Sequence, residues 1–129
     1  MTKKEDVSSM ETYNAEARSH VESRSDGDVR VVVMAGEFDI DNVADLRIAL
    51  DPAASGVTRF VLDVAAVTFV DSAALGIMLQ PALDRPVVLA GAVPRRLARL
   101  LELTGADMVF ATAPSVAEGT VMVVPPRQG

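Results

Sequence analysis

The chain holds one candidate nucleophile and one histidine that could act as its base, Ser72 and His20. A serine hydrolase would need the two to converge, and its serine would lie in a Gly-x-Ser-x-Gly turn that exposes the hydroxyl. Ser72 instead lies in Val-Asp-Ser-Ala-Ala, and His20 lies in a polar segment far from any glycine-rich turn. We therefore expect His20 to be a solvated edge residue, and a small hydrolase is the least favoured of three functional hypotheses.

Acidic residues gather in one short segment of the chain. Between Gly36 and Leu46 there is no base and there are four acids, namely Glu37, Asp39, Asp41 and Asp45. Paired carboxylates such as Asp39 and Asp41 could perform general acid–base catalysis, but no second catalytic group is evident nearby in the sequence. Two compatible interpretations remain. Asp41 or Asn42 caps the helix that follows, whose positive end favours the other acids, or the segment is a recognition surface.

A second polar pair, Asp71 and Ser72, follows another buried strand and begins a helix. Both polar groups thus come directly after the carboxyl end of a strand, where open α/β sheets usually hold their sites. The plain structural interpretation is that Asp71 or Ser72 caps the helix by accepting a backbone N–H. Capping alone does not explain why the two strand ends look alike.

The composition excludes several classes of site. The chain has no cysteine, which rules out disulfides, thiolate zinc sites, iron–sulfur clusters and a cysteine nucleophile. It has no HExxH, Walker-type or GxGxxG motif, so we expect no catalytic residue, no metal and no cofactor. A net charge of −6, with four Phe and one Tyr, argues against direct binding of nucleic acid and favours a partner that presents positive charge.

No segment of the sequence predicts secretion or a membrane span. The first 20 residues are rich in charge and lack the apolar core of a signal peptide. The longest run without a charged residue, 72–83, has 12 residues, whereas a membrane-spanning helix needs roughly 20. We therefore expect a soluble, cytoplasmic protein.

Apolar runs of strand length alternate with stripes of helical spacing along the chain. Core strands are expected at 29–35, ended by Gly36, and at 60–64, 87–90 and 108–110, with an edge strand at 13–23. Helices are expected at 43–50, 75–82, 94–104 and 114–123. Because this alternation requires crossover connections, the sequence predicts one α/β domain over 13–123, with a mostly parallel sheet of four to five strands and about four helices. Residues 1–12 and 124–129 are expected to be flexible.

Three motifs together resemble the STAS domain of bacterial anti-sigma factor antagonists. They are Gly-Glu-Phe-Asp at 36–39, Phe-Val-Leu-Asp at 60–63, and Val-Thr-Phe-Val-Asp-Ser at 67–72 followed by Leu75 and Gly76. The resemblance extends over about residues 13–123 and implies a STAS-type fold. In that family the serine directly after the aspartate, here Ser72, is phosphorylated by an anti-sigma factor that is also a serine kinase.

The resemblance implies partner switching without catalytic activity. The unmodified protein would bind the anti-sigma factor and release a sigma factor, and a phosphatase acting on phosphorylated Ser72 would restore binding. The implied partner-binding surface comprises Glu37, Asp39, Asp41, Asn42, Asp71, Ser72, Ala73, Ala74, Leu75 and Gly76.

The chain departs from many relatives directly after Ser72. It has Ala73 and Ala74, where Ser or Thr followed by Gly is common. A β-carbon at position 74 would obstruct the close approach of a kinase backbone. This favours an alternative, a STAS scaffold module that uses the same surface without phosphorylation, for example in a stress-sensing complex or with a transporter ATPase.

Overall fold

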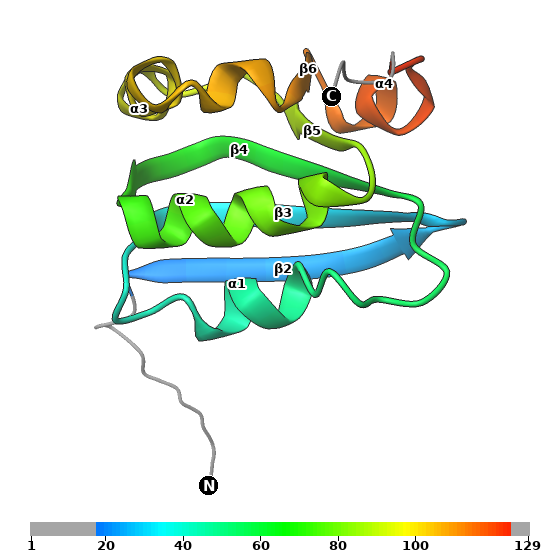
Figure 1. Ribbon diagram of the computed structural model, residues 1–129, viewed down its shortest axis with the longest axis horizontal. Coiled ribbons are helices and arrows are strands. Elements are labelled where there is room, and N and C mark those ends of the chain that lie inside the picture. Colours follow the sequence, from blue (N-terminus) through cyan, green and yellow to red (C-terminus); the bar gives the residue numbers. More distant parts are fainter. Residues whose placement is uncertain (1–17, 125–129) are drawn as a thin grey trace, which may run out of the picture.

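The computed structural model describes residues 18–124, which form a five-stranded sheet covered by helices (Figure 1). The strands are β2 (Ser19–Asp26), β3 (Val29–Phe38), β4 (Arg59–Val70), β5 (Val87–Ala90) and β6 (Ala111–Ala113). The helices are α1 (Ala44–Ala49), α2 (Ser72–Leu79), α3 (Arg95–Thr104) and α4 (Val116–Val121), with 3₁₀ turns at Gln80–Leu83 and Ala106–Met108. The segment 1–12, and all but the first residue of the expected tail 124–129, lie outside the described residues.

The strands follow one another across the sheet in chain order, β2-β3-β4-β5-β6. β2 pairs antiparallel with β3, and the other three pairings are parallel. Crossovers between parallel strands are right-handed, and all three here step in the same direction, so α1, α2 and α3 fall on one face of the sheet. The prediction of an α/β domain with a mostly parallel sheet of four to five strands and about four helices is confirmed within residues 18–124.

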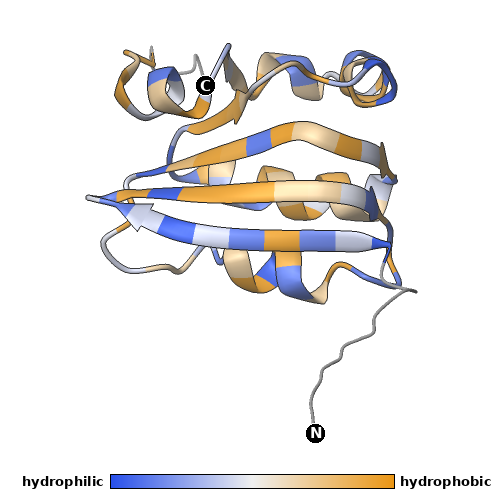
Figure 2. Cartoon of the chain, turned by 180° about the vertical axis from the view of Figure 1, so that it is seen from behind, coloured by the Kyte–Doolittle hydropathy of each residue, from blue (hydrophilic) through white to orange (hydrophobic). Residues whose placement is uncertain are grey.

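Each face of the sheet has its own core. On one face, Leu46 of α1 and Met78 of α2 are fully buried against the strands. On the other face, Val61 and Val88 lie under α4. Gly119 brings that helix so close that an added β-carbon would lie 3.2 Å from Val61. Seen from behind, β2, β3 and β4 lie in front of α1 and α2 (Figure 2).

The polar sequence of β2 suits its place at the edge of the sheet. Val21 packs partly buried against the core, whereas most of the strand is hydrophilic (Figure 2). Charged residues on an edge strand discourage pairing with another sheet. The His20 side chain is 63% exposed, and its Nε2 lies 2.7 Å from Oε2 of Glu22. The prediction that His20 is a solvated edge residue is confirmed.

The expectation that the first core strand ends at Gly36 is wrong, because β3 continues to Phe38. Gly36 has φ of +91°, and the pairing of β3 with β4 shifts register between Gly36 and Glu37. An added β-carbon at this position would collide with the backbone oxygen of Arg18. Glycine leaves that oxygen free to accept the N–H of Glu37 at 2.8 Å. Gly36 therefore forms an irregularity inside the strand and does not end it.

The expected last strand at 108–110 is also wrong. Gly105, with φ of +79°, ends α3 as the sequence predicts, but the next residues form the 3₁₀ turn Ala106–Met108. Phe110 is buried in the core on the α1–α3 face, and β6 begins one residue later, where Ala111 pairs with Val88. Periodicity alone cannot place so short an apolar run.

Candidate functional site

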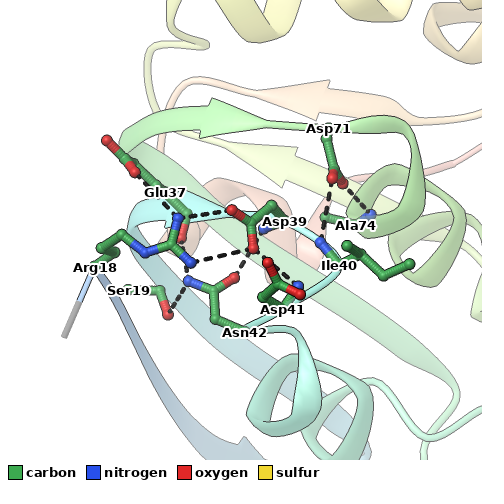
Figure 3. Close-up of polar contacts among 9 residues, drawn as sticks. All are labelled: Arg18, Ser19, Glu37, Asp39, Ile40, Asp41, Asn42, Asp71 and Ala74. Atoms are coloured by element: carbon green, nitrogen blue, oxygen red, sulfur yellow. Dashed lines mark hydrogen bonds and ion pairs between the residues drawn. The ribbon is translucent and has the colours of Figure 1, made fainter.

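The carboxyl ends of β3 and β4 lie side by side at one edge of the sheet, where Phe38 pairs with Val70. The loop from β3 to α1 therefore meets the start of α2. The backbone N–H of Asp71 donates to the oxygen of Phe38 at 3.1 Å. The structure thus brings the two polar groups of the sequence together at one place (Figure 3).

The carboxylate of Asp71 joins these two segments. Its Oδ1 accepts the backbone N–H of Ala74 at 2.9 Å, which makes Asp71 the N-cap of α2, one of the two caps that the sequence predicts. Its Oδ2 accepts the N–H of Ile40, in the β3–α1 loop, at 3.2 Å. One side chain therefore caps a helix and fixes the neighbouring loop (Figure 3).

Asn42 closes the β3–α1 loop on itself. Its Oδ1 accepts the N–H of Asp39 at 2.8 Å, and its Nδ2 donates to the backbone oxygen of Glu37 at 2.9 Å and to Oγ of Ser19 at 3.1 Å. The helix that follows begins without a side-chain cap. The prediction that Asp41 or Asn42 caps this helix is wrong. Val43 holds the N-cap position, and the amide of Asn42 bonds to Asp39 and to the adjoining ends of β2 and β3 instead.

Arg18 pairs with a carboxylate of this loop. Its Nη1 lies 2.6 Å from Oδ2 of Asp39, its Nη2 lies 3.3 Å from Oδ1, and Nη1 lies 3.6 Å from Oε1 of Glu37. The hydrogen bond between Arg18 and Asp39 lowers the pKa of Asp39 and raises the pKa of Arg18. The sequence does not single out Arg18, since the acidic segment itself contains no base. Antiparallel pairing of β2 with β3 brings the two together.

The edge of the site remains acidic around one exposed apolar side chain. Four carboxylates lie here, those of Glu37, Asp39, Asp41 and Asp71. The positive charge of Arg18 offsets one of them, that of Asp39. Ile40 is 70% exposed, and Asp71 holds its backbone in place. The sequence does not single out Ile40 either. Its signal is a large apolar residue between two acids, beyond the strand expected at 29–35 and before the helix expected at 43–50.

The start of α2 divides into exposed and buried positions. Ser72 is its first residue and is exposed, and no hydrogen bond engages its hydroxyl within residues 18–124. Gly76, one turn later, is also exposed, and an added β-carbon there would meet nothing within 4 Å. Ala73 is half-buried, whereas Ala74 and Leu75 lie in the core. Of this segment, a partner can therefore reach Ser72, Ala73 and Gly76 directly.

The serine–histidine pair of a hydrolase is not assembled, because His20 contacts Glu22 and the Ser72 hydroxyl forms no hydrogen bond with a side chain among the described residues. Across the same residues, no group of three or more His, Cys, Asp or Glu side chains is placed to hold a metal ion. None of the helices between residues 18 and 124 has the length and apolar character needed to cross a bilayer.

Comparison with known proteins identifies the fold. An anti-sigma factor antagonist from Mycobacterium paratuberculosis matches with a TM-score of 0.69 at 21% sequence identity, over 84% of this chain and 96% of that one. The anti-sigma factor antagonist SpoIIAA in its unphosphorylated form matches with a TM-score of 0.63 at 16% identity, over 82% of this chain and 100% of that one. No curated protein matches the chain. The family model described as "Mlab, STAS domain" matches residues 21–112, more than half of the 129 residues, and the chain therefore belongs to the STAS domain family.

Proposed function

We propose that this chain is an anti-sigma factor antagonist controlled by phosphorylation of Ser72. The unmodified form binds an anti-sigma factor that is also a serine kinase, and this binding frees a sigma factor. Phosphorylation of Ser72 abolishes the binding, and a phosphatase restores it. The observation that carries the proposal is the exposed Ser72 at the first residue of α2, next to Asp71 and the acidic β3–α1 loop.

The STAS domain match and the likeness in fold to two anti-sigma factor antagonists support the choice of partner. The partner would find an apolar anchor in Ile40, whose backbone N–H is held by Asp71 at the start of α2. Interfaces draw most of their affinity from a few such anchors. On the exposed side of α2, Gly76 lets a partner backbone approach the helix closely, because no side chain projects there.

A phosphate on Ser72 is expected to leave the fold intact. It adds about −1.5 to −2 charges at neutral pH. The free N–H groups and the dipole at a helix N-terminus favour an anion. Because Ser72 is exposed, the phosphate extends into solvent and displaces no core side chain.

The same phosphate is expected to weaken binding strongly. Glu37, Asp41 and Asp71 already make this edge acidic, and the single arginine there pairs mainly with Asp39. A partner surface fitted to the neutral hydroxyl would cover the new charge without a counter-charge. Like-charge or unpaired-charge contacts cost several kcal/mol at an interface, and since each 1.4 kcal/mol is tenfold, affinity should fall by about 100-fold or more.

A STAS scaffold module without phosphorylation, as in a stress-sensing or transporter complex, is the second candidate. It rests on the alanines after Ser72, and the structure separates their contributions. The Ala74 side chain is fully buried, so its β-carbon points into the core and does not obstruct a kinase. Only the half-buried Ala73 remains in favour of this candidate.

Incubation of the full chain with a panel of anti-sigma kinases and ATP, followed by intact-mass analysis, distinguishes the two candidates. The antagonist gains about 80 Da, the mass of one phosphoryl group. The gain should disappear in Ser72→Ala and persist in Ser55→Ala, whose serine is exposed in the connection between α1 and β4. A gain that survives Ser72→Ala contradicts the assignment of the switch, and no gain with a kinase that binds favours the scaffold.

A further inference from the structure

A groove of about 330 Å³ lies between the end of β4 and one side of α3. Its lining residues are Phe69, Val70, Arg96, Arg99, Leu100 and Leu103. Phe69 is 39% exposed and Leu103 is 73% exposed, so large apolar side chains meet solvent here. The volume is at the low end of the roughly 300–1,000 Å³ typical of small-molecule pockets. It suits one or two side chains of a partner better than a cofactor.

The groove also carries concentrated positive charge, although the chain as a whole has a net charge of −6. Arg95, Arg96 and Arg99 are all exposed on α3. Within residues 18–124, none of their guanidinium groups forms an ion pair or a hydrogen bond. Glu102, the one acid of α3, does not line the groove. The occupant that complements these features carries carboxylates beside an apolar side chain.

We propose that this groove binds an acidic amphipathic segment of a partner protein. An apolar side chain of the segment packs between Phe69 and Leu103, and its carboxylates contact Arg96 and Arg99. Helices commonly bind grooves in this way, through apolar residues spaced along one face. The groove does not include Ser72, so this inference does not rest on the phosphorylation proposed above.

An anionic lipid surface offers similar chemistry, but the charge of the chain argues against it. Recognition of anionic lipids typically uses clusters of about 4–8 basic residues. Here three arginines lie on a chain with 18 acidic and 12 basic residues, and acidic membranes would repel most of its surface. A protein segment, which makes contact only at the groove, avoids this repulsion.

Selection from a displayed library of random peptides of about 16 residues, long enough for several helical turns, on the immobilised full chain tests the proposal. We expect the recovered peptides to combine Asp or Glu with Leu, Ile or Phe. In fluorescence anisotropy, the double substitution Arg96→Glu and Arg99→Glu should weaken their binding by about 10-fold or more, the change that 1.4 kcal/mol produces. Leu103→Glu, on the α3 wall of the groove and highly exposed, should weaken binding in the same way.

Arg95→Glu is the control, because it makes once, on the same helix but outside the groove, the charge reversal that the double variant makes twice. Its peptide binding should stay within about 2-fold of the unchanged chain. The proposal is overturned if the recovered peptides lack acidic residues, if none is recovered, or if Arg95→Glu weakens binding as much as the groove substitutions. It is also overturned if the chain binds phosphatidylserine vesicles through Arg96 and Arg99, since the occupant would then be a lipid surface.

Discussion

Replacing Asp71 by alanine removes two hydrogen bonds at once, because its two oxygens accept N–H groups from different segments. Loss of an N-cap costs about 1 kcal/mol, and loss of the loop hydrogen bond costs about 1 kcal/mol more. We therefore expect Asp71→Ala to lower the free energy of unfolding by about 2 kcal/mol. For a domain of this size, that loss corresponds to a fall in Tm of about 8 °C.

Asp71→Asn separates the two contributions. Asparagine caps helices about as well as aspartate, so the bond from Ala74 should remain. With its oxygen facing Ala74, its amide nitrogen takes the position of the Oδ2 that accepts the N–H of Ile40, and this nitrogen cannot accept a hydrogen bond. We expect a loss of about 1 kcal/mol, half of that in the alanine variant. Asp45→Ala, which removes an exposed acid from the first turn of α1, is the control and should change stability by no more than about 0.5 kcal/mol.

Urea unfolding followed by circular dichroism measures all three variants. Amide hydrogen exchange at Ile40 adds a local readout, because this N–H should lose protection in both Asp71 variants. Equal losses of stability in Asp71→Asn and Asp71→Ala would refute the separate role of the loop bond. An Asp71→Ala variant as stable as Asp45→Ala would refute the capping role as well.

Three further substitutions test other parts of the site. Gly36→Ala should lower the free energy of unfolding, measured in urea, by about 3 kcal/mol. The alanine would have an unfavourable positive φ, and its β-carbon would also collide with the backbone oxygen of Arg18. Gly56→Ala, with φ of +78° in open space, should lose only about 1 kcal/mol. The pKa of Asp39 is lowered in the folded state. Its ionised carboxylate therefore stabilises the folded state at pH values above the ordinary pKa of 3.8, and this stabilisation is lost as the pH falls through the lowered pKa. The free energy of unfolding of Arg18→Met, measured in urea across this pH range, should therefore change less with pH than that of the unchanged chain. Identical profiles of the two chains would contradict the ion pair. Ile40→Ala should weaken binding of an anti-sigma factor by about 10-fold in calorimetry. The control is Ile48→Ala, because Ile48 is 73% exposed and Ile40 is 70% exposed. This control should leave the affinity unchanged.

The fold was largely predictable because apolar patterning decides where the central strands lie. The runs at 29–35, 60–64 and 87–90 are apolar since these strands are buried in the sheet. The errors arise where a residue has a role that periodicity does not encode. Gly36 resembles a strand end in sequence, but it allows β2 to approach β3 closely. Phe110 resembles part of a strand, but it anchors the segment before β6 in the core.

The meeting of the two polar segments was predictable, because the carboxyl ends of neighbouring parallel strands share one edge. The individual partners of each side chain were not. Asp41 or Asn42 was expected to cap a helix, yet the amide of Asn42 bonds to its own loop and to the adjoining ends of β2 and β3. Arg18 lies 21 residues from Asp39 in the sequence, and only the register of β2 against β3 brings them together. Such contacts depend on tertiary pairing and leave no local pattern.

The central claim, that Ser72 switches binding without unfolding the domain, is tested most directly by comparing two forms of the full chain. Calorimetry measures the affinity of an anti-sigma factor for the unmodified chain and for the chain phosphorylated at Ser72, and thermal unfolding measures the Tm of each. We predict an affinity lower by about 100-fold or more in the phosphorylated form, with a Tm changed by less than about 2 °C. Equal affinities, or a loss of binding that accompanies unfolding, would contradict the proposed switch.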